Sequence, residues 1–123
     1  MRIAITMTII AAALATPALA QNYPVDGKWA ESDSSQSGAI DCTNSKRVIE
    51  FNGDQRTDSN GGAPAYRSKS IMSVGASSYR IVDEFSTGQI SAGQSEYTLR
   101  KVDDDHIVMN MGGGSIKLQR CQR

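Results

Sequence analysis

The chain alternates apolar and polar residues over short segments that turn-forming residues separate. These segments are 46–51, 55–59, 66–74, 77–85, 95–102, 106–111 and 115–122. Alternation with a period of two predicts β-strands that each bury one face. Between the first two segments, the pair Asn52-Gly53 favours a tight hairpin. With a further strand at Trp29, the pattern predicts about eight strands and at most a minor helical component.

Most apolar residues within a segment share one parity, and this parity defines the predicted core. The predicted core residues are Ile49, Phe51, Tyr79, Ile81, Phe85, Tyr97, Leu99, Ile107, Met109, Met111, Ile116 and Leu118. The opposite parity carries Glu50, Arg80, Glu84, Glu96, Arg100, Asn110 and Lys117. These charged and polar residues predict a solvated outer face. Asp83 is the exception, since it shares the parity of Ile81, and we expect a bulge or a place near the barrel mouth to put it in water.

Short antiparallel strands with one apolar face each predict an all-β fold. An up-and-down barrel of about eight strands suits them best, because closure removes exposed strand edges. A two-sheet β-sandwich is the alternative.

The first twenty residues have the features of a secretory signal peptide. Arg2 gives a positive start, residues 3–15 form an apolar run, and Ala18-Leu19-Ala20 is a small-x-small cleavage site. The apolar run is too short for a membrane span, and we expect no span elsewhere. Sequence analysis therefore predicts a signal peptide at 1–20 and a single β-barrel domain at 21–123, exported to the periplasm or secreted.

Charge and cysteine content narrow the class of partner. Residues 21–123 carry 12 Lys and Arg against 13 Asp and Glu, so no general attraction to nucleic acid or to anionic lipid is expected. An exported chain with two cysteines most simply forms one disulfide, here Cys42 to Cys121. On the chain-entropy model this crosslink stabilises the fold by roughly 4 to 5 kcal/mol.

The stretch Gly27-Lys28-Trp29 resembles the G-x-W signature on the first strand of the lipocalin family. Arg120, on the last predicted strand, stands where that family places an arginine across the tryptophan. The resemblance implies that Trp29 closes one end of the barrel as a structural plug with Arg120 packed on it. The chain is also similar in size to bacterial proteinase-inhibitor barrels and to c-type lysozyme inhibitors. The lysozyme inhibitors run a disulfide from an early strand to the end of the chain, as the predicted pair Cys42 and Cys121 would here.

Residues with catalytic or metal-binding potential are few. His106 is the only histidine, which excludes a zinc site with several imidazoles within one chain. Asp103, Asp104 and Asp105 lack the regular series of oxygen ligands of a calcium loop, and no G-x-S-x-G motif accompanies the serines. We therefore expect no enzymatic activity, no metal and no cofactor.

Five basic residues on predicted outer faces form a possible binding surface: Arg67, Lys69, Arg80, Arg100 and Lys117. They predict either a basic stripe for an acidic partner or an ordinary mixed-charge surface, because Glu84 and Glu96 lie among them. The loops 32–41, 53–65 and 86–94 are further candidate contact surfaces. The expected function is that of a monomeric binding module, inhibitor-like or an envelope accessory protein. A carrier of small apolar ligands is the alternative.

Overall fold

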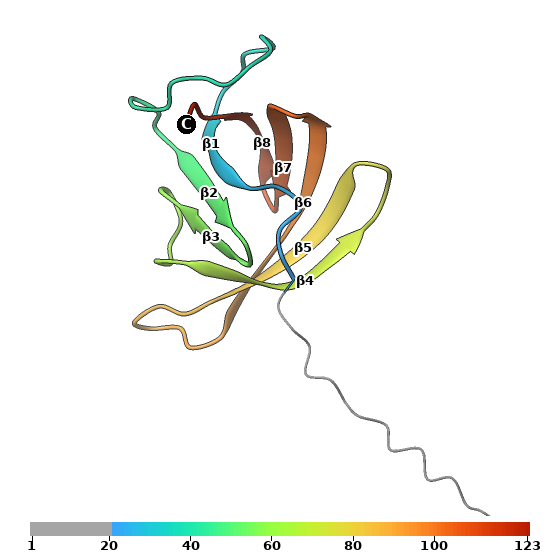
Figure 1. Ribbon diagram of the computed structural model, residues 1–123. Coiled ribbons are helices and arrows are strands. Elements are labelled where there is room, and N and C mark those ends of the chain that lie inside the picture. The colour runs from blue at the N-terminus through green and yellow to red at the C-terminus, as the bar shows by residue number, and fades with distance from the viewer. Residues whose placement is uncertain (1–20) are drawn as a thin grey trace, which may run out of the picture.

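Residues 21–123, which the computed structural model describes, form a closed barrel of eight antiparallel strands (Figure 1). The strands are β1 (Gly27–Glu31), β2 (Val48–Asn52), β3 (Gln55–Asp58), β4 (Tyr66–Ser73), β5 (Ser78–Phe85), β6 (Gly93–Asp103), β7 (His106–Met111) and β8 (Gly114–Arg120). Each strand pairs with its neighbours in sequence, and β1 also pairs with β8. The predicted up-and-down barrel is confirmed, and the β-sandwich alternative is wrong. The predicted signal peptide at 1–20 lies outside the described residues.

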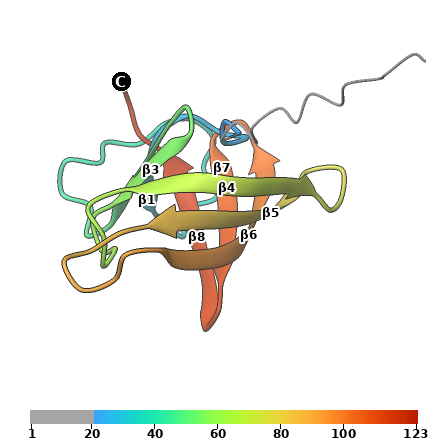
Figure 2. The same cartoon turned by 90° about the horizontal axis from the view of Figure 1, so that it is seen from below.

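The longest strand, β6, connects two differently oriented parts of the barrel. Figure 2 shows β4 and β5 running across the direction of β7 and β8. Along its length β6 pairs with β5 from Gly93 to Arg100 and with β7 from Tyr97 to Asp103. Arg100 therefore lies where the two parts meet. Among residues 21–123, no helix has the length and apolar character needed to cross a bilayer.

The hairpin between β2 and β3 turns at Asn52-Gly53, as the sequence predicts. Gly53 has a φ of 62°, in the left-handed region that favours glycine. Asn52 pairs directly with Gln55, so the connection is tight.

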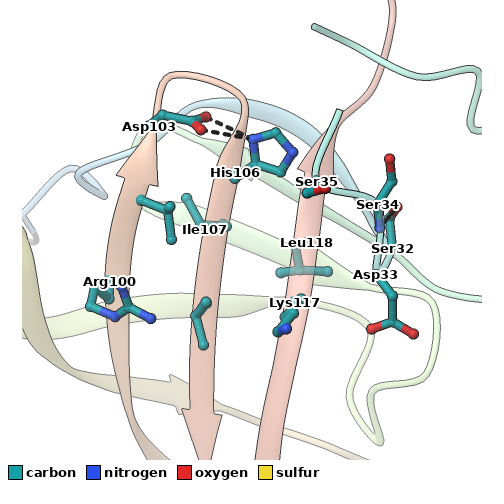
Figure 3. A pocket seen from close by; sticks show the side chains of 12 residues that line it. Ser32, Asp33, Ser34, Ser35, Arg100, Asp103, His106, Ile107, Lys117 and Leu118 are labelled. Carbon is teal, nitrogen blue, oxygen red and sulfur yellow. Dashed lines mark hydrogen bonds and ion pairs between the residues drawn. The ribbon is translucent and has the colours of Figure 1, made fainter. Parts of the chain in front are cut away.

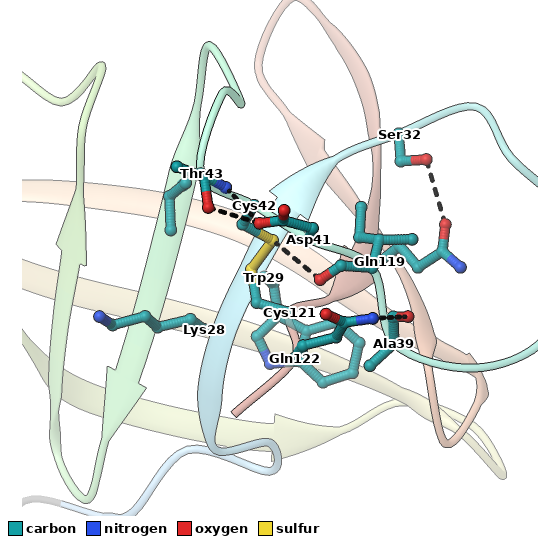
Figure 4. Close-up of a disulfide and its surroundings, with 12 residues drawn as sticks. Lys28, Trp29, Ser32, Ala39, Asp41, Cys42, Thr43, Gln119, Cys121 and Gln122 are labelled. Atoms are coloured by element: carbon teal, nitrogen blue, oxygen red, sulfur yellow. Dashed lines mark hydrogen bonds between the residues drawn. A yellow bond between two sulfur atoms is a disulfide. The ribbon is translucent and has the colours of Figure 1, made fainter.

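Closure of the barrel brings the first and last strands together. Trp29 pairs with Arg120 across β1 and β8, and the Arg120 guanidinium carbon lies 4.4 Å from the centre of the indole. Trp29 is buried, and its Nε1 donates a hydrogen bond to the carbonyl oxygen of Asp26. The Cys42–Cys121 disulfide joins the segment after β1 to the residue that follows β8 (Figure 4). The predicted disulfide is confirmed.

Apolar side chains fill most of the interior. The buried apolar cluster contains Tyr23, Val25, Trp29, Ile49, Phe51, Ile81, Tyr97, Leu99, Ile107, Met109 and Leu118. Four predicted core residues, Tyr79, Phe85, Met111 and Ile116, are only partly buried. The assignment of parity from the sequence is therefore correct along the strands and weakest near their ends.

The expectation that Asp83 reaches water is wrong. The Asp83 side chain keeps the inward parity of β5 and is fully buried. Its Oδ2 lies 2.8 Å from Nε of Arg56, a residue of β3 that is also inside the barrel. Because a buried carboxylate is stable only when it is paired, the guanidinium of Arg56 is what permits Asp83 to stay inside.

The segment before β1 covers this part of the interior. The backbone N–H of Tyr23 donates to the carbonyl oxygen of Gly53, and the Tyr23 hydroxyl donates to Oδ1 of Asp83 over 2.7 Å. The junction between β3 and β4 has only two paired positions, the shortest register in the barrel. Gln21 lies beside β4, where its side-chain oxygen accepts a hydrogen bond from the backbone of Ile71.

Candidate functional site

A groove of about 300 Å³ crosses the outer face of β6, β7 and β8 (Figure 3). One side is formed by residues 32–35, which follow β1, and the floor by residues of the three strands, most of them outward-facing. We call it the β6–β8 groove; its charged members are Asp33, Arg100, Asp103 and Lys117, and His106 lies beside Asp103. Val102 and Val108 supply the outward apolar surface, and Val102 is 51% exposed.

The side of the groove formed by residues 32–35 is held in place by Gln119. This glutamine has outward parity on β8, yet it is fully buried beneath the segment. Its Nε2 donates to the carbonyl oxygens of Gln36 and Gly38, both at 3.0 Å, and its Oε1 accepts from the Ser32 hydroxyl. The backbone N–H of Ser32 also donates to the carbonyl oxygen of Lys117. Hydrogen bonds to a buried side chain give the segment a defined position.

The strand register places a cation on each side of an apolar residue. Arg100 on β6 pairs with Val108 on β7, and Val108 pairs with Lys117 on β8. Side chains at directly paired positions lie on the same face of a sheet, with neighbouring strands about 4.8 Å apart. The two cations therefore flank Val108, with their backbones about 10 Å apart.

The five basic residues that the sequence analysis selected differ in their ion pairing. Three of them face carboxylates: Arg67 lies 3.7 Å from Asp54, Lys69 lies 3.7 Å from Glu84, and Arg80 lies 3.6 Å from Glu96. Arg100 and Lys117 have no carboxylate within 4.0 Å among residues 21–123, and both line the β6–β8 groove.

One end of the groove carries a histidine–aspartate pair. Nδ1 of His106 lies 2.8 Å and 3.0 Å from the two carboxylate oxygens of Asp103. This hydrogen bond, together with one from the backbone N–H of Asp105, lowers the pKa of Asp103 below its ordinary value. In the part of the chain that the structure describes, no three His, Cys, Asp or Glu side chains are grouped as metal ligands.

A second polar site lies inside the barrel and extends to the partly exposed Arg47; we call it the Arg56 cluster: Tyr23, Arg47, Arg56, Asp58, Asp83 and Tyr97. The guanidinium carbon of Arg56 lies 4.1 Å from the centre of the Tyr66 ring and 5.1 Å from that of Tyr97. Its Nη1 lies 3.6 Å from Asp58, whose carboxylate also pairs with Arg47 at 2.6 Å. The cluster thus balances two guanidinium groups with two carboxylates.

Protonation states in the Arg56 cluster follow from burial and pairing. Burial, with the nearby Asp83 carboxylate, raises the pKa of Tyr23 far above its ordinary value. Burial likewise raises the pKa of Tyr97, and proximity to Arg56 offsets only part of this effect. For Asp58, burial acts to raise the pKa, but the hydrogen bonds from Arg47 and Asn60 outweigh it and hold the pKa below its usual range. The charges of the Arg56 cluster are compensated within the cluster, which is typical of a structural site.

Sequence reasoning selected Arg100, Lys117 and the loop 32–41, but not the combination of the three. The signal for Val108 was present in the sequence, because its parity on 106–111 is opposite to that of Ile107. The signal for Gln119 was absent, since an outward glutamine on the last strand is expected to contact solvent.

Comparison of the chain with protein-family models, with curated proteins and with solved structures returned no match. The proposals for this protein therefore rest on the geometry and charge of the site alone.

Proposed function

We propose that the protein is an exported, non-enzymatic binding module that contacts another protein through the outer surface of its barrel, with the β6–β8 groove at the centre. The proposal includes export to the periplasm or the exterior and action as a monomer. The observation that carries it is the contrast between a groove with two unpaired cations and an interior whose charges are already paired.

The alternative of a small-ligand carrier has less support. A lipocalin-like carrier needs an interior cavity lined mainly by apolar groups. Here Leu99 and Met109 are fully buried in the middle of the barrel, and the Arg56 cluster occupies the adjacent space. Four surface depressions of the described chain are lined mainly by residues at loops, strand ends or outer faces.

Site-specific photo-cross-linking in the exported protein tests this proposal. A photoreactive amino acid at Val102, on the groove, is expected to give a protein adduct of discrete mass. The same amino acid at Glu50, on the outer face of β2 and away from the groove, serves as the matched control and is expected to give none. Native mass spectrometry of the exported protein addresses the carrier: a co-purified apolar molecule together with no adduct at Val102 contradicts the binding module.

A further inference from the structure

The geometry points to a specific ligand for the β6–β8 groove: we propose that it binds an extended polypeptide segment of a partner protein in which two acidic side chains flank an apolar one. This inference rests on the proposed function and names the chemistry that the groove recognises.

The first argument is the order of side chains across the sheet. Arg100, Val108 and Lys117 occupy directly paired positions, so a cation, an apolar group and a cation follow one another across β6, β7 and β8. In Figure 3, Arg100 and Lys117 lie on opposite sides of β7. A complementary ligand presents the sequence acidic, apolar, acidic on one face.

The second argument is spacing. In an extended chain, alternate residues point to the same side, so the first, third and fifth residues of a segment share one face over about 13 Å. The backbones of Arg100 and Lys117 are about 10 Å apart. Long, flexible arginine and lysine side chains cover the difference of a few ångströms. The segment acidic-x-apolar-x-acidic therefore matches the row.

The third argument is the state of the charges. Arg67, Lys69 and Arg80 each face a carboxylate of this chain, whereas the two groove cations do not. A partner carboxylate at Arg100 or Lys117 displaces only water and counterions, and does not have to break an internal ion pair.

The fourth argument separates a polypeptide from a dense polyanion. Asp33 and Asp103 also line the groove, so a nucleic acid or a sulfated glycan brings like charges against them. A segment with two separate carboxylates brings less negative charge against Asp33 and Asp103, and each carboxylate can lie beside a cation. Its central apolar residue covers Val102 and Val108, which a polyanion leaves in contact with charge.

Fluorescence anisotropy with a labelled synthetic peptide tests the inference. The probe carries the core Glu-Thr-Leu-Thr-Glu between Gly-Ser flanks. Saturable binding that weakens with added salt is the expected result, because the contacts are exposed ion pairs. Two further peptides, with both Glu changed to Gln or with Leu changed to Ser, are expected to bind about tenfold more weakly.

Variants of the protein locate the binding. The double variant Arg100→Ser/Lys117→Ser is expected to lose about tenfold in peptide affinity. The double variant Lys69→Ser/Arg80→Ser removes two cations that are already ion-paired, and it is expected to bind as the unchanged protein does. All four side chains are exposed, so near-equal melting temperatures verify that each variant folds.

Three outcomes overturn the inference. These are no saturable binding of the Glu-Thr-Leu-Thr-Glu peptide, equal loss of affinity in the two double variants, or tighter binding of a heparin fragment than of the peptide.

The cross-linking experiment distinguishes failure of this inference from failure of the proposed function. If the Val102 adduct forms and Arg100→Ser/Lys117→Ser does not reduce it, the binding module stands and the acidic ligand is wrong. If no adduct forms at Val102, the proposed function itself fails.

Discussion

Two arginines of this barrel pack on aromatic rings, and their surroundings differ. Arg120 lies over Trp29 at the end of the barrel with 26% of its side chain exposed, and Asp26 and Asp105 lie 3.6 Å and 3.8 Å away. Arg56 lies over Tyr66 inside the barrel with 1% exposed. Water stabilises the partly exposed charge of Arg120, whereas the charge of Arg56 is stabilised by buried carboxylates. Although the two ring contacts are similar, we expect the fold to lose more stability when Arg56 loses its carboxylate partner than when Arg120 loses one.

The largest expected effect is at Asp83. Asp83→Ala removes the closest counter-charge of Arg56 and the acceptor of the Tyr23 hydroxyl. We expect a loss of about 3–5 kcal/mol in the free energy of unfolding, measured by urea denaturation. The double variant Arg56→Met/Asp83→Leu removes both charges, and it is expected to recover most of this stability. A single-variant loss below about 1 kcal/mol contradicts a dry, coupled pair.

A loss of stability of similar size is expected when the Trp29 ring beneath Arg120 is removed. Trp29→Ala deletes a fully buried indole, and we expect destabilisation by roughly 3–5 kcal/mol. Native tryptophan fluorescence, which comes from this residue alone, is expected to be blue-shifted. Emission near that of free tryptophan, with an unchanged melting temperature in Trp29→Ala, identifies Trp29 as a recognition residue instead.

An intermediate effect is expected at alkaline pH, and only at the Arg56 cluster. Tyr23 and Tyr97 have pKa values in the folded state above their ordinary value of about 10. Their contribution to the stability of the fold is complete below pH 10. It is lost as the pH rises, because the unfolded chain releases the phenolic protons at a lower pH than the folded chain does. Each phenol is expected to lower the free energy of unfolding by about 1.4 kcal/mol per pH unit above 10. Tyr23→Phe is expected to reduce this slope, and an unchanged slope excludes Tyr23 as its source.

The smallest effect is expected for Arg120 itself. Arg120→Met keeps an aliphatic contact with Trp29 and leaves Asp26 and Asp105 accessible to water. We expect a loss of about 0.5–2 kcal/mol by thermal unfolding. A loss as large as that of Asp83→Ala removes the distinction between the two arginines.

The sequence was sufficient to predict the strands because most of their apolar residues keep one parity, as in Ile107 and Met109. It was not sufficient for the Arg56 cluster. Strand β3 has polar residues at all four positions, so parity gives no sign that Arg56 points inward. Its partner Asp83 lies on a different strand, 27 residues away. Recognition of the pair therefore requires the three-dimensional fold.

The candidate site was predictable in part for a related reason. Alternation placed Arg100 and Lys117 on the outer face correctly, as their exposure shows. Their position in one row with Val108 depends on the register of β6, β7 and β8, which the turns determine. The position of the adjoining segment 32–35 depends on Gln119, and no local pattern in the sequence indicates that Gln119 is buried.

The pairing of Trp29 with Arg120 also has a consequence for the order of events during folding. The two residues are 91 positions apart, and the β1–β8 contact that completes the sheet requires almost the whole described chain. Contacts between such distant residues form slowly and late. Cys121 follows directly after β8, so its oxidation with Cys42 waits for the same segment to emerge. If the chain is exported from its amino end, its early strands reach the new compartment before their last partner does, and they present open edges during that interval.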